Sequence, residues 1–272
     1  MKRVFILLLV LSLITVPVLA EETVTVKVGV VGSTNEQWTQ VLVPALAKEG
    51  INIELVEFSD YVMPNIALAQ GDIDMNAFQH YNFLNNWNNE NSETYGCKLA
   101  AIGETLIAPL SLYSAKYTSI EELKDGDTIA IMNDPVNEAR ALRVLEANGI
   151  ITLSDDITEN ATIIDIVENP LNLKFYEVDA SMVGSMLPDP SIAVGFMNGQ
   201  YATQAGYAHE SAILVEAFDK ENPEQHGIIN VIAVREEDQE NETYLRIAEA
   251  YQCDEVKEVF DTLYAGSFLA AW

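Results

Sequence analysis

The sequence is poor in the side chains that most enzymes and metal proteins use for chemistry. Its 272 residues include three histidines and two cysteines. A serine-hydrolase elbow, glycine-rich nucleotide loops and a zinc-type His-Glu-x-x-His pattern are all missing. We therefore predict no catalytic residue, no metal and no cofactor. Carboxylates are so abundant that an exported hydrolase with a dispersed acidic pair stays open as an alternative.

Basic residues are also scarce. Lysine and arginine number 14 against 42 aspartates and glutamates, and the formal net charge is −28. A surface of this charge repels nucleic acid and anionic lipid, so neither is an expected partner. The simplest interpretation of this charge is an acidic, well-solvated surface.

Long apolar runs are missing after the first twenty residues. Lys2 and Arg3 precede an apolar stretch over 4–16, and Val18-Leu19-Ala20 ends the segment with small residues. This pattern is typical of a secretory signal peptide cleaved after Ala20, with a retained anchor as the alternative. Glu21 follows, where a lipoprotein has a cysteine. We expect export to the periplasm or cell surface, where Cys97 and Cys253 could equally well pair or stay free.

Hydrophobic periodicity predicts an α/β fold. Alternating valines over 24–30 and an apolar run over 51–58 favour strands, and the segments between and after them favour helices. A long strand-like run covers 99–112. A second set follows, with strands over 128–132, 173–178, 192–196 and 228–234 and a helix from Pro135 to Asn148. The final helix, over 242–264, is expected to break near Cys253.

The clearest polar motif is Asn133-Asp-Pro-Val-Asn-Glu-Ala-Arg140 at a predicted helix start. Asn137 and Arg140 are three residues apart and share a helix face. An arginine opposes the helix dipole in the first turns, so it needs another reason to be there. A bidentate clamp on a ligand carboxylate is one such reason, and a salt bridge to one of the many acids is the other.

Aromatic side chains form the second candidate site. Phe78, His80, Tyr81 and Phe83 follow one another closely, and Tyr61 lies upstream. Such a set can wall a pocket for an apolar side chain. Ordinary packing explains it as well.

Five segments of the sequence resemble the NlpA/MetQ-type methionine-binding lipoproteins, in order and over essentially the whole mature chain. They are Val56–Asn65, Gly71–His80, Asn133–Asn137, Val167–Leu173 and Ala250–Val256. The resemblance implies a periplasmic-binding-protein fold, with two α/β lobes joined by two crossovers. Residues 1–20 would be the signal peptide, 21–108 plus 228–272 the first lobe and 109–227 the second.

The resemblance also implies a function and a site. The ligand would be L-methionine or a related small molecule, delivered to an ABC importer's permease and its ATPase. Arg140 would hold the ligand carboxylate with support from Asn137, and Asn198 and Asn230 would hold the amino and carboxylate groups. The residues expected to wall the pocket are Tyr61, Phe78, His80, Tyr81 and Phe83.

Two departures from the family pattern bear on the ligand. Ala108 stands where an aromatic residue often precedes the proline, and the spacing over 81–83 is altered. Both predict a changed side-chain pocket. A methionine-containing dipeptide or another apolar amino acid is therefore an alternative ligand, and a scaffolding protein without a small ligand is a rival of another class.

Overall fold

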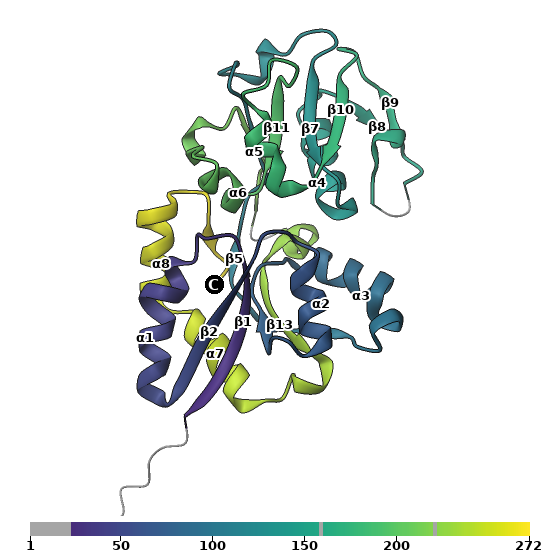
Figure 1. Cartoon of the computed structure of the whole chain (residues 1–272). Helices are drawn as coiled ribbons and strands as arrows, with labels where there is room; N and C mark the ends of the chain where they lie inside the picture. Colours follow the sequence, from purple (N-terminus) through teal and green to yellow (C-terminus); the bar gives the residue numbers. More distant parts are fainter. Residues whose placement is uncertain (1–22, 158–159, 220–221) are drawn as a thin grey trace, which may run out of the picture.

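The computed structural model describes residues 23–157, 160–219 and 222–272 (Figure 1). They form two lobes, one above the other in Figure 1, each built around a five-stranded sheet. The predicted signal peptide lies outside the described residues. Within the described ranges, no helix has both the length and the apolar character needed to cross a membrane.

The first sheet has the strand order β2-β1-β3-β13-β4. Strand β1 (Val24–Val31) lies parallel to β2 (Ile51–Phe58) and to β3 (Met75–Asn76). Strand β13 (Val231–Arg235) returns late in the chain and pairs antiparallel with both β3 and β4 (Leu99–Glu104). The last four residues of β1 and the first four of β13 are all buried, because helices cover both faces of the sheet.

The second sheet has the order β10-β7-β11-β6-β12. Strand β7 (Thr128–Met132) is parallel to β10 (Lys174–Val178) and β11 (Val194–Met197). Strand β6 (Ser111–Tyr113) is antiparallel to β11 and to β12 (Leu214–Val215). A small hairpin of β8 (Thr152–Leu153) and β9 (Ile166–Glu168) extends this lobe.

The chain passes between the two sheets twice, once between β5 (Leu106–Ile107) and β6 and once between β12 and β13. Strand β5 pairs with β14 (Leu269–Ala270). The single long strand predicted over 99–112 was wrong: it is divided into β4, β5 and β6, because the chain changes lobes there. The lobe boundaries at 108/109 and 227/228 fall in these passages and stay predictions.

Local sequence signals set the bounds of the helices in the first lobe. A helical segment runs through η1 (Gln37–Leu42), α1 (Val43–Leu46) and η2 (Ala47–Glu49), and it changes from π-type to α-type next to Pro44, which lacks an N–H donor. Helix α2 (Met63–Gln70) follows a turn in which Asp60 Oδ1 accepts from the backbone amides of Val62 and Met63, and it ends at Gly71 in the left-handed region. Helix α3 spans Tyr81–Tyr95.

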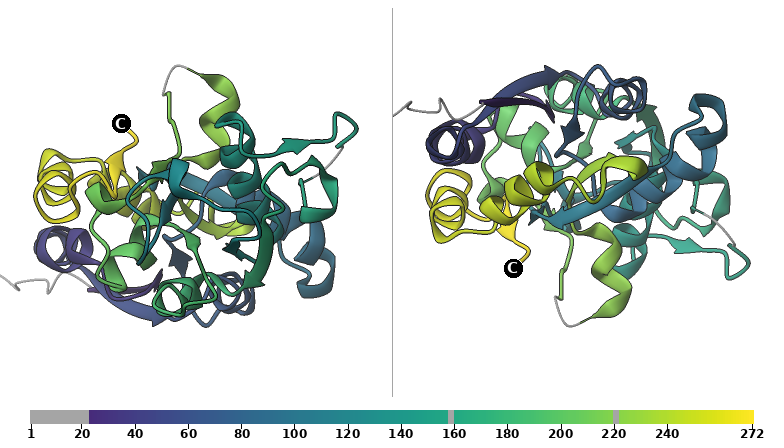
Figure 2. Two further views of the ribbon diagram at one scale, coloured as in Figure 1. Left: turned by 90° about the horizontal axis from the view of Figure 1, so that it is seen from above. Right: turned by 90° about the horizontal axis from the view of Figure 1, so that it is seen from below.

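The C-terminal segment completes this lobe. Helices α7 (Glu242–Tyr251), α8 (Asp254–Val259) and η9 (Phe260–Tyr264) confirm the predicted break near Cys253. Figure 2 shows this segment, in yellow, beside the first helical segment, in purple. The Tyr264 hydroxyl accepts from the Glu36 amide at 3.2 Å, and Trp38 packs edge-on against Tyr251. The first and last described segments thus share one core.

The second lobe holds α4 (Pro135–Ala147), α5 (Val183–Met186) and α6 (Gly199–Gln204). Short 3-10 turns connect the elements: η3 (Ile120–Glu122), η4 (Ile163–Asp165), η5 (Ala180–Met182), η6 (His209–Ser211), η7 (Pro223–Ile228) and η8 (Glu236–Asp238). The core of this lobe forms a cluster of its own, which also takes in first-lobe residues at the interface, among them Val31 and Phe78.

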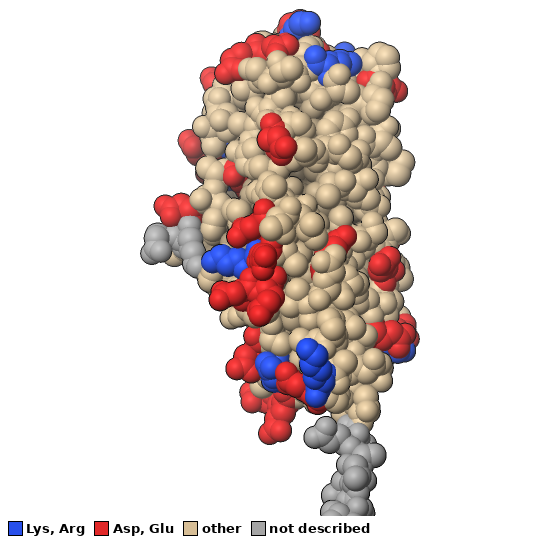
Figure 3. Space-filling view, turned by 90° about the vertical axis from the view of Figure 1, so that its left-hand side faces the viewer, with Lys and Arg blue, Asp and Glu red and all other residues tan. Residues whose placement is uncertain are grey.

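On the face shown in Figure 3, acidic side chains are spread from end to end and basic ones are few. Both cysteines are half-buried free thiols, so the disulfide alternative does not hold. Burial raises the pKa of the Cys97 and Cys253 thiols.

Candidate binding site between the lobes

A cavity lies where the two lobes meet. Seven of the nine predicted site residues line it: Tyr61, Phe78, His80, Phe83, Asn137, Asn198 and Asn230. Further lining residues include Thr34, Gln37, Ala108 and Gln200. Within the described part of the chain, no aspartate, glutamate, lysine or arginine lines this cavity. A ligand there meets amides, aromatic rings and hydroxyls, with charged groups only behind them.

An aromatic cluster forms one wall. The rings of Tyr61, Phe78 and Phe83 lie 5.9–6.1 Å apart, centroid to centroid. Tyr201 of the second lobe packs 5.1 Å from Tyr61, and its hydroxyl donates to the Ser59 carbonyl at 3.0 Å. Burial raises the pKa of Tyr61 well above its ordinary value, so this phenol stays neutral. The wall suits an apolar, polarisable side chain.

His80 presents a hydrogen-bond donor to the cavity. It is the N-cap of α3, where Nδ1 accepts from the Phe83 amide at 3.2 Å. The remaining nitrogen, Nε2, is buried and has no partner among the described residues. Burial, helped by the positive charge of Arg140, lowers the pKa of His80 to about 3. The imidazole is therefore neutral, with its proton on Nε2.

A chain of hydrogen bonds fixes the orientation of two asparagines. Asp134 caps α4 and accepts from Asn137 through both the backbone amide, at 2.8 Å, and Nδ2, at 3.0 Å. Asn137 Oδ1 then accepts from Asn198 Nδ2 over a long 3.4 Å contact. Asn198 Oδ1 is left buried without a partner in the described structure. The Asp134 carboxylate can only accept, so Asn137 donates to it through Nδ2 and accepts from Asn198 through Oδ1. Asn198 therefore donates through Nδ2, and its Oδ1 faces the cavity as an acceptor.

Asn230 lies on the second passage between the lobes. Its backbone N–H donates to Leu106 at 2.7 Å, and its carbonyl accepts from Thr105 at 2.8 Å. Its side-chain Nδ2 donates to the Phe78 carbonyl at 3.1 Å. Asn230 is thereby held between β5 and the aromatic segment, with its side-chain oxygen free of any hydrogen bond in the described ranges.

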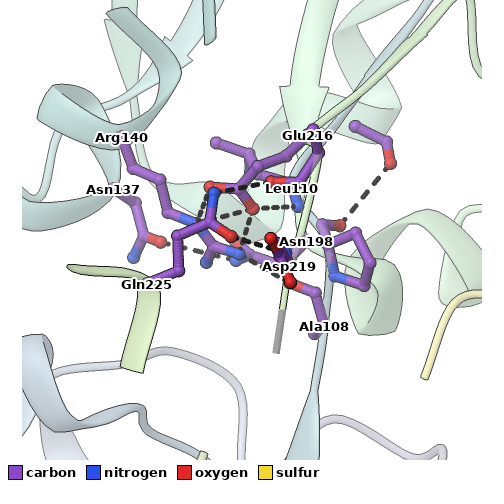
Figure 4. Close-up of polar contacts among 11 residues, drawn as sticks. Ala108, Leu110, Asn137, Arg140, Asn198, Glu216, Asp219 and Gln225 are labelled. Atoms are coloured by element: carbon purple, nitrogen blue, oxygen red, sulfur yellow. Dashed lines mark hydrogen bonds and ion pairs between the residues drawn. The ribbon is translucent and has the colours of Figure 1, made fainter. Parts of the chain in front are cut away.

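Arg140 does not line this cavity. It borders an adjacent one, which also touches His80, and its guanidinium is already paired (Figure 4). Arg140 Nε donates to the Glu216 carboxylate at 2.7 and 2.9 Å, and Nη2 donates to Glu216 and to the Ala108 carbonyl. The sequence left open a ligand clamp or a salt bridge. The structure contains the salt bridge, and the bidentate edge is occupied by Glu216.

Tyr81 is the second predicted residue that lies elsewhere. As the first residue of α3 it points away from the cavity, where its hydroxyl donates to Glu104 at 3.4 Å and its ring stacks on His226 at 4.9 Å. Its placement in the pocket wall was wrong. The N-cap at His80 determines the direction of both side chains.

Several polar residues of the site were missed from the sequence. Thr34 Oγ1 and Gln37 Oε1 line the cavity as buried atoms without partners in the described structure, and both follow the turn after β1. Polar residues at the carboxyl end of a parallel strand were the available signal. Glu216 had no signal among 42 acidic residues. Across the described ranges, no group of three histidines, cysteines or carboxylates is arranged to hold a metal.

Comparisons with known proteins bear on the family and the fold. The family model for the NlpA lipoprotein matches residues 26–272. The chain is 39% identical over 249 residues to the D-methionine-binding lipoprotein MetQ of Escherichia coli strain K12, covering 91% of this chain and 88% of that protein.

Solved structures give the same result. The crystal structure of the methionine-binding protein MetQ superposes with a TM-score of 0.82 at 39% identity, covering 91% of this chain and 98% of that one. A nutrient-binding protein from Burkholderia cenocepacia, bound to methionine, has a TM-score of 0.81 at 36% identity and is covered completely, over 91% of this chain. The fold is that of a periplasmic substrate-binding protein, as predicted, and the chain belongs to the NlpA lipoprotein family.

Proposed function

We propose that the protein is an exported substrate-binding protein that captures L-methionine, or a close analogue, for an ABC importer. It is a binding protein and not an enzyme. The observation that carries the proposal is the interlobe cavity, where unpaired amide oxygens and an imidazole N–H lie beside an aromatic wall. The relatives named for methionine binding agree with this ligand.

The polar atoms of the cavity suit a zwitterion. Asn198 Oδ1 and Gln37 Oε1 are acceptors for the ligand ammonium, and His80 Nε2 is a donor for its carboxylate. Arg140 has one amino group, Nη1, that makes no hydrogen bond within the described residues. We assign Nη1 a single, not a bidentate, contact to the carboxylate, made from the adjacent cavity that shares His80 with this one. Asn230 completes the polar end.

The aromatic wall would take the thioether. Sulfur contacts with ring edges are favourable, and burial of a side chain of this size contributes roughly 2–3 kcal/mol. The Tyr201–Ser59 hydrogen bond joins the lobes on this side of the cavity. Ligand contacts from both lobes would therefore favour the closed arrangement, which the permease and its ATPase would distinguish from the open one.

A methionine-containing dipeptide is the second candidate. Ala108 lines the cavity with a small side chain, and the adjacent cavity, which shares His80, offers space beyond it. Titration with such dipeptides beside free methionine decides between the two, because the tighter ligand identifies the substrate. Both enantiomers of methionine belong in the same series.

Two matched substitutions test the site. Asn198→Leu removes the ammonium acceptor, and we expect roughly 10- to 100-fold weaker methionine binding by calorimetry, since hydrogen bonds to charged groups contribute about 1.5–3 kcal/mol. Tyr81→Phe, outside the cavity, should bind like the unmodified protein. Normal affinity in the Asn198 variant, or loss in the Tyr81 variant, would show that the site has been misassigned.

A further inference from the structure

The charge pair behind the cavity has a consequence for ligand choice. Arg140 is buried and Glu216 largely so, with side chains 7% and 11% exposed. Glu216 approaches the Nε–Nη2 edge of the guanidinium with both carboxylate oxygens and also accepts from the Leu110 amide at 3.0 Å. Three donor groups from two residues, Arg140 Nε, Arg140 Nη2 and the Leu110 amide, therefore fix the carboxylate in place.

The pair adjoins the cavity. Arg140 Nη2 donates to the carbonyl of Ala108, a cavity-lining residue, at 2.8 Å. His80 touches both this cavity and the one that Arg140 borders, and the arginine's charge contributes to lowering the His80 pKa. A change in the charge of either residue therefore changes the electrostatic potential inside the cavity.

The cavity itself adds no charge to that of the pair. Its described lining has no ionised residue, and His80 is neutral. Asp134, which accepts from the cavity-lining Asn137, also interacts with Arg140. Removal of Glu216 therefore makes the surroundings of the cavity more positive by one charge, which favours a ligand of net charge −1. With Glu216 in place the positive charge of Arg140 is balanced, and the ammonium group of a zwitterion gains an attraction that an anion without this group lacks.

We propose that Glu216 is a specificity-determining residue, which neutralises Arg140 and so makes the cavity select amino acids of zero net charge over carboxylate anions. This inference rests on the proposed function. A purely structural ion pair would affect stability but would leave the ratio of affinities for differently charged ligands unchanged.

The experiment compares two ligands with the same thioether chain and the same carboxylate. L-methionine is the zwitterion, and 4-(methylthio)butanoate lacks the amino group and is an anion. Calorimetric affinities at pH 8 give the ratio of methionine to butanoate binding. In Glu216→Gln we expect this ratio to fall more than about tenfold, the effect of a unit charge about 10 Å away at an effective dielectric constant of about 20.

Two further variants make the test decisive. The double variant Arg140→Gln, Glu216→Gln restores the net charge of the unmodified site, so its ratio should return to that of the unmodified protein although both ligands bind more weakly. Arg140→Gln alone leaves the opposite charge and should raise the ratio, which decides the matter if Glu216→Gln fails to fold. An unmodified protein that binds no methionine would refute the proposed function. Methionine binding with the same ratio in every variant would refute the role of Glu216 alone.

Discussion

The buried imidazole of His80 should make stability depend on pH in a measurable way. Its pKa is lowered from 6.5 to about 3, chiefly by burial. The folded protein therefore resists a proton that the unfolded chain accepts below pH 6.5. The contribution is fully present above that pH and is lost as the pH falls toward 3.

The size of the effect follows from the two pKa values. At pH 5 the unfolded chain has taken up the proton and the folded protein has not. This pH lies 1.5 units below the ordinary His80 pKa of 6.5. At about 1.4 kcal/mol for each pH unit, protonation of the unfolded chain at His80 lowers the free energy of unfolding by about 2 kcal/mol when the pH falls from 8 to 5. The residue is 5% exposed, so solvent screens little of this.

Urea unfolding of the ligand-free protein at pH 8 and pH 5 measures the loss. The His80→Gln variant removes the titrating group, so its loss between the two pH values should be smaller than that of the unmodified protein by about 2 kcal/mol. The matched control is His209→Gln, at a partly exposed position outside the cavity. An equal pH dependence in the unmodified protein and the His80 variant would refute the reasoning.

Three other predictions concern packing and thiols. Asn65 exchanges two side-chain hydrogen bonds with Gln79, at 2.7 and 2.8 Å, in a buried amide network, so Asn65→Leu should lower the unfolding free energy in urea by about 3 kcal/mol; an unchanged midpoint would contradict this. A side chain at Gly199 would overlap the Ser267 carbonyl across the lobes, so Gly199→Val should weaken methionine binding at least about tenfold with normal circular dichroism, and normal affinity would show that closure tolerates it. Both cysteines are free, so denatured, unreduced protein should react with two equivalents of a thiol reagent, and none would indicate a disulfide.

Much of the fold could be predicted because local chemistry determines it. The Asp134 cap and Pro135 at the first helical position place the start of α4, and the left-handed Gly71 ends α2. The break between β5 and β6 could not be read in the same way. Its cause is the passage from one sheet to another, and the run over 99–112 stays largely apolar on both sides of Pro109, so its hydrophobicity does not mark where the chain changes lobes.

The candidate site was predictable to a similar degree. Asn137, Asn198 and His80 were found because motif and resemblance marked them, and the structure brings them to one cavity. Glu216 was not, because its partner Arg140 is 76 positions away and the chain offers 42 acidic residues. Spacing carries no information about such a pair, and only the folded chain shows which carboxylate the arginine meets.

The most direct test of the central claim is calorimetric titration of the unfolded and refolded, ligand-free protein with L-methionine, with native mass spectrometry to count the bound molecules. We predict one methionine per chain and a clear rise in melting temperature at saturation. Absence of both, with no other small amino acid or dipeptide bound, would contradict the assignment of the interlobe cavity as a methionine site.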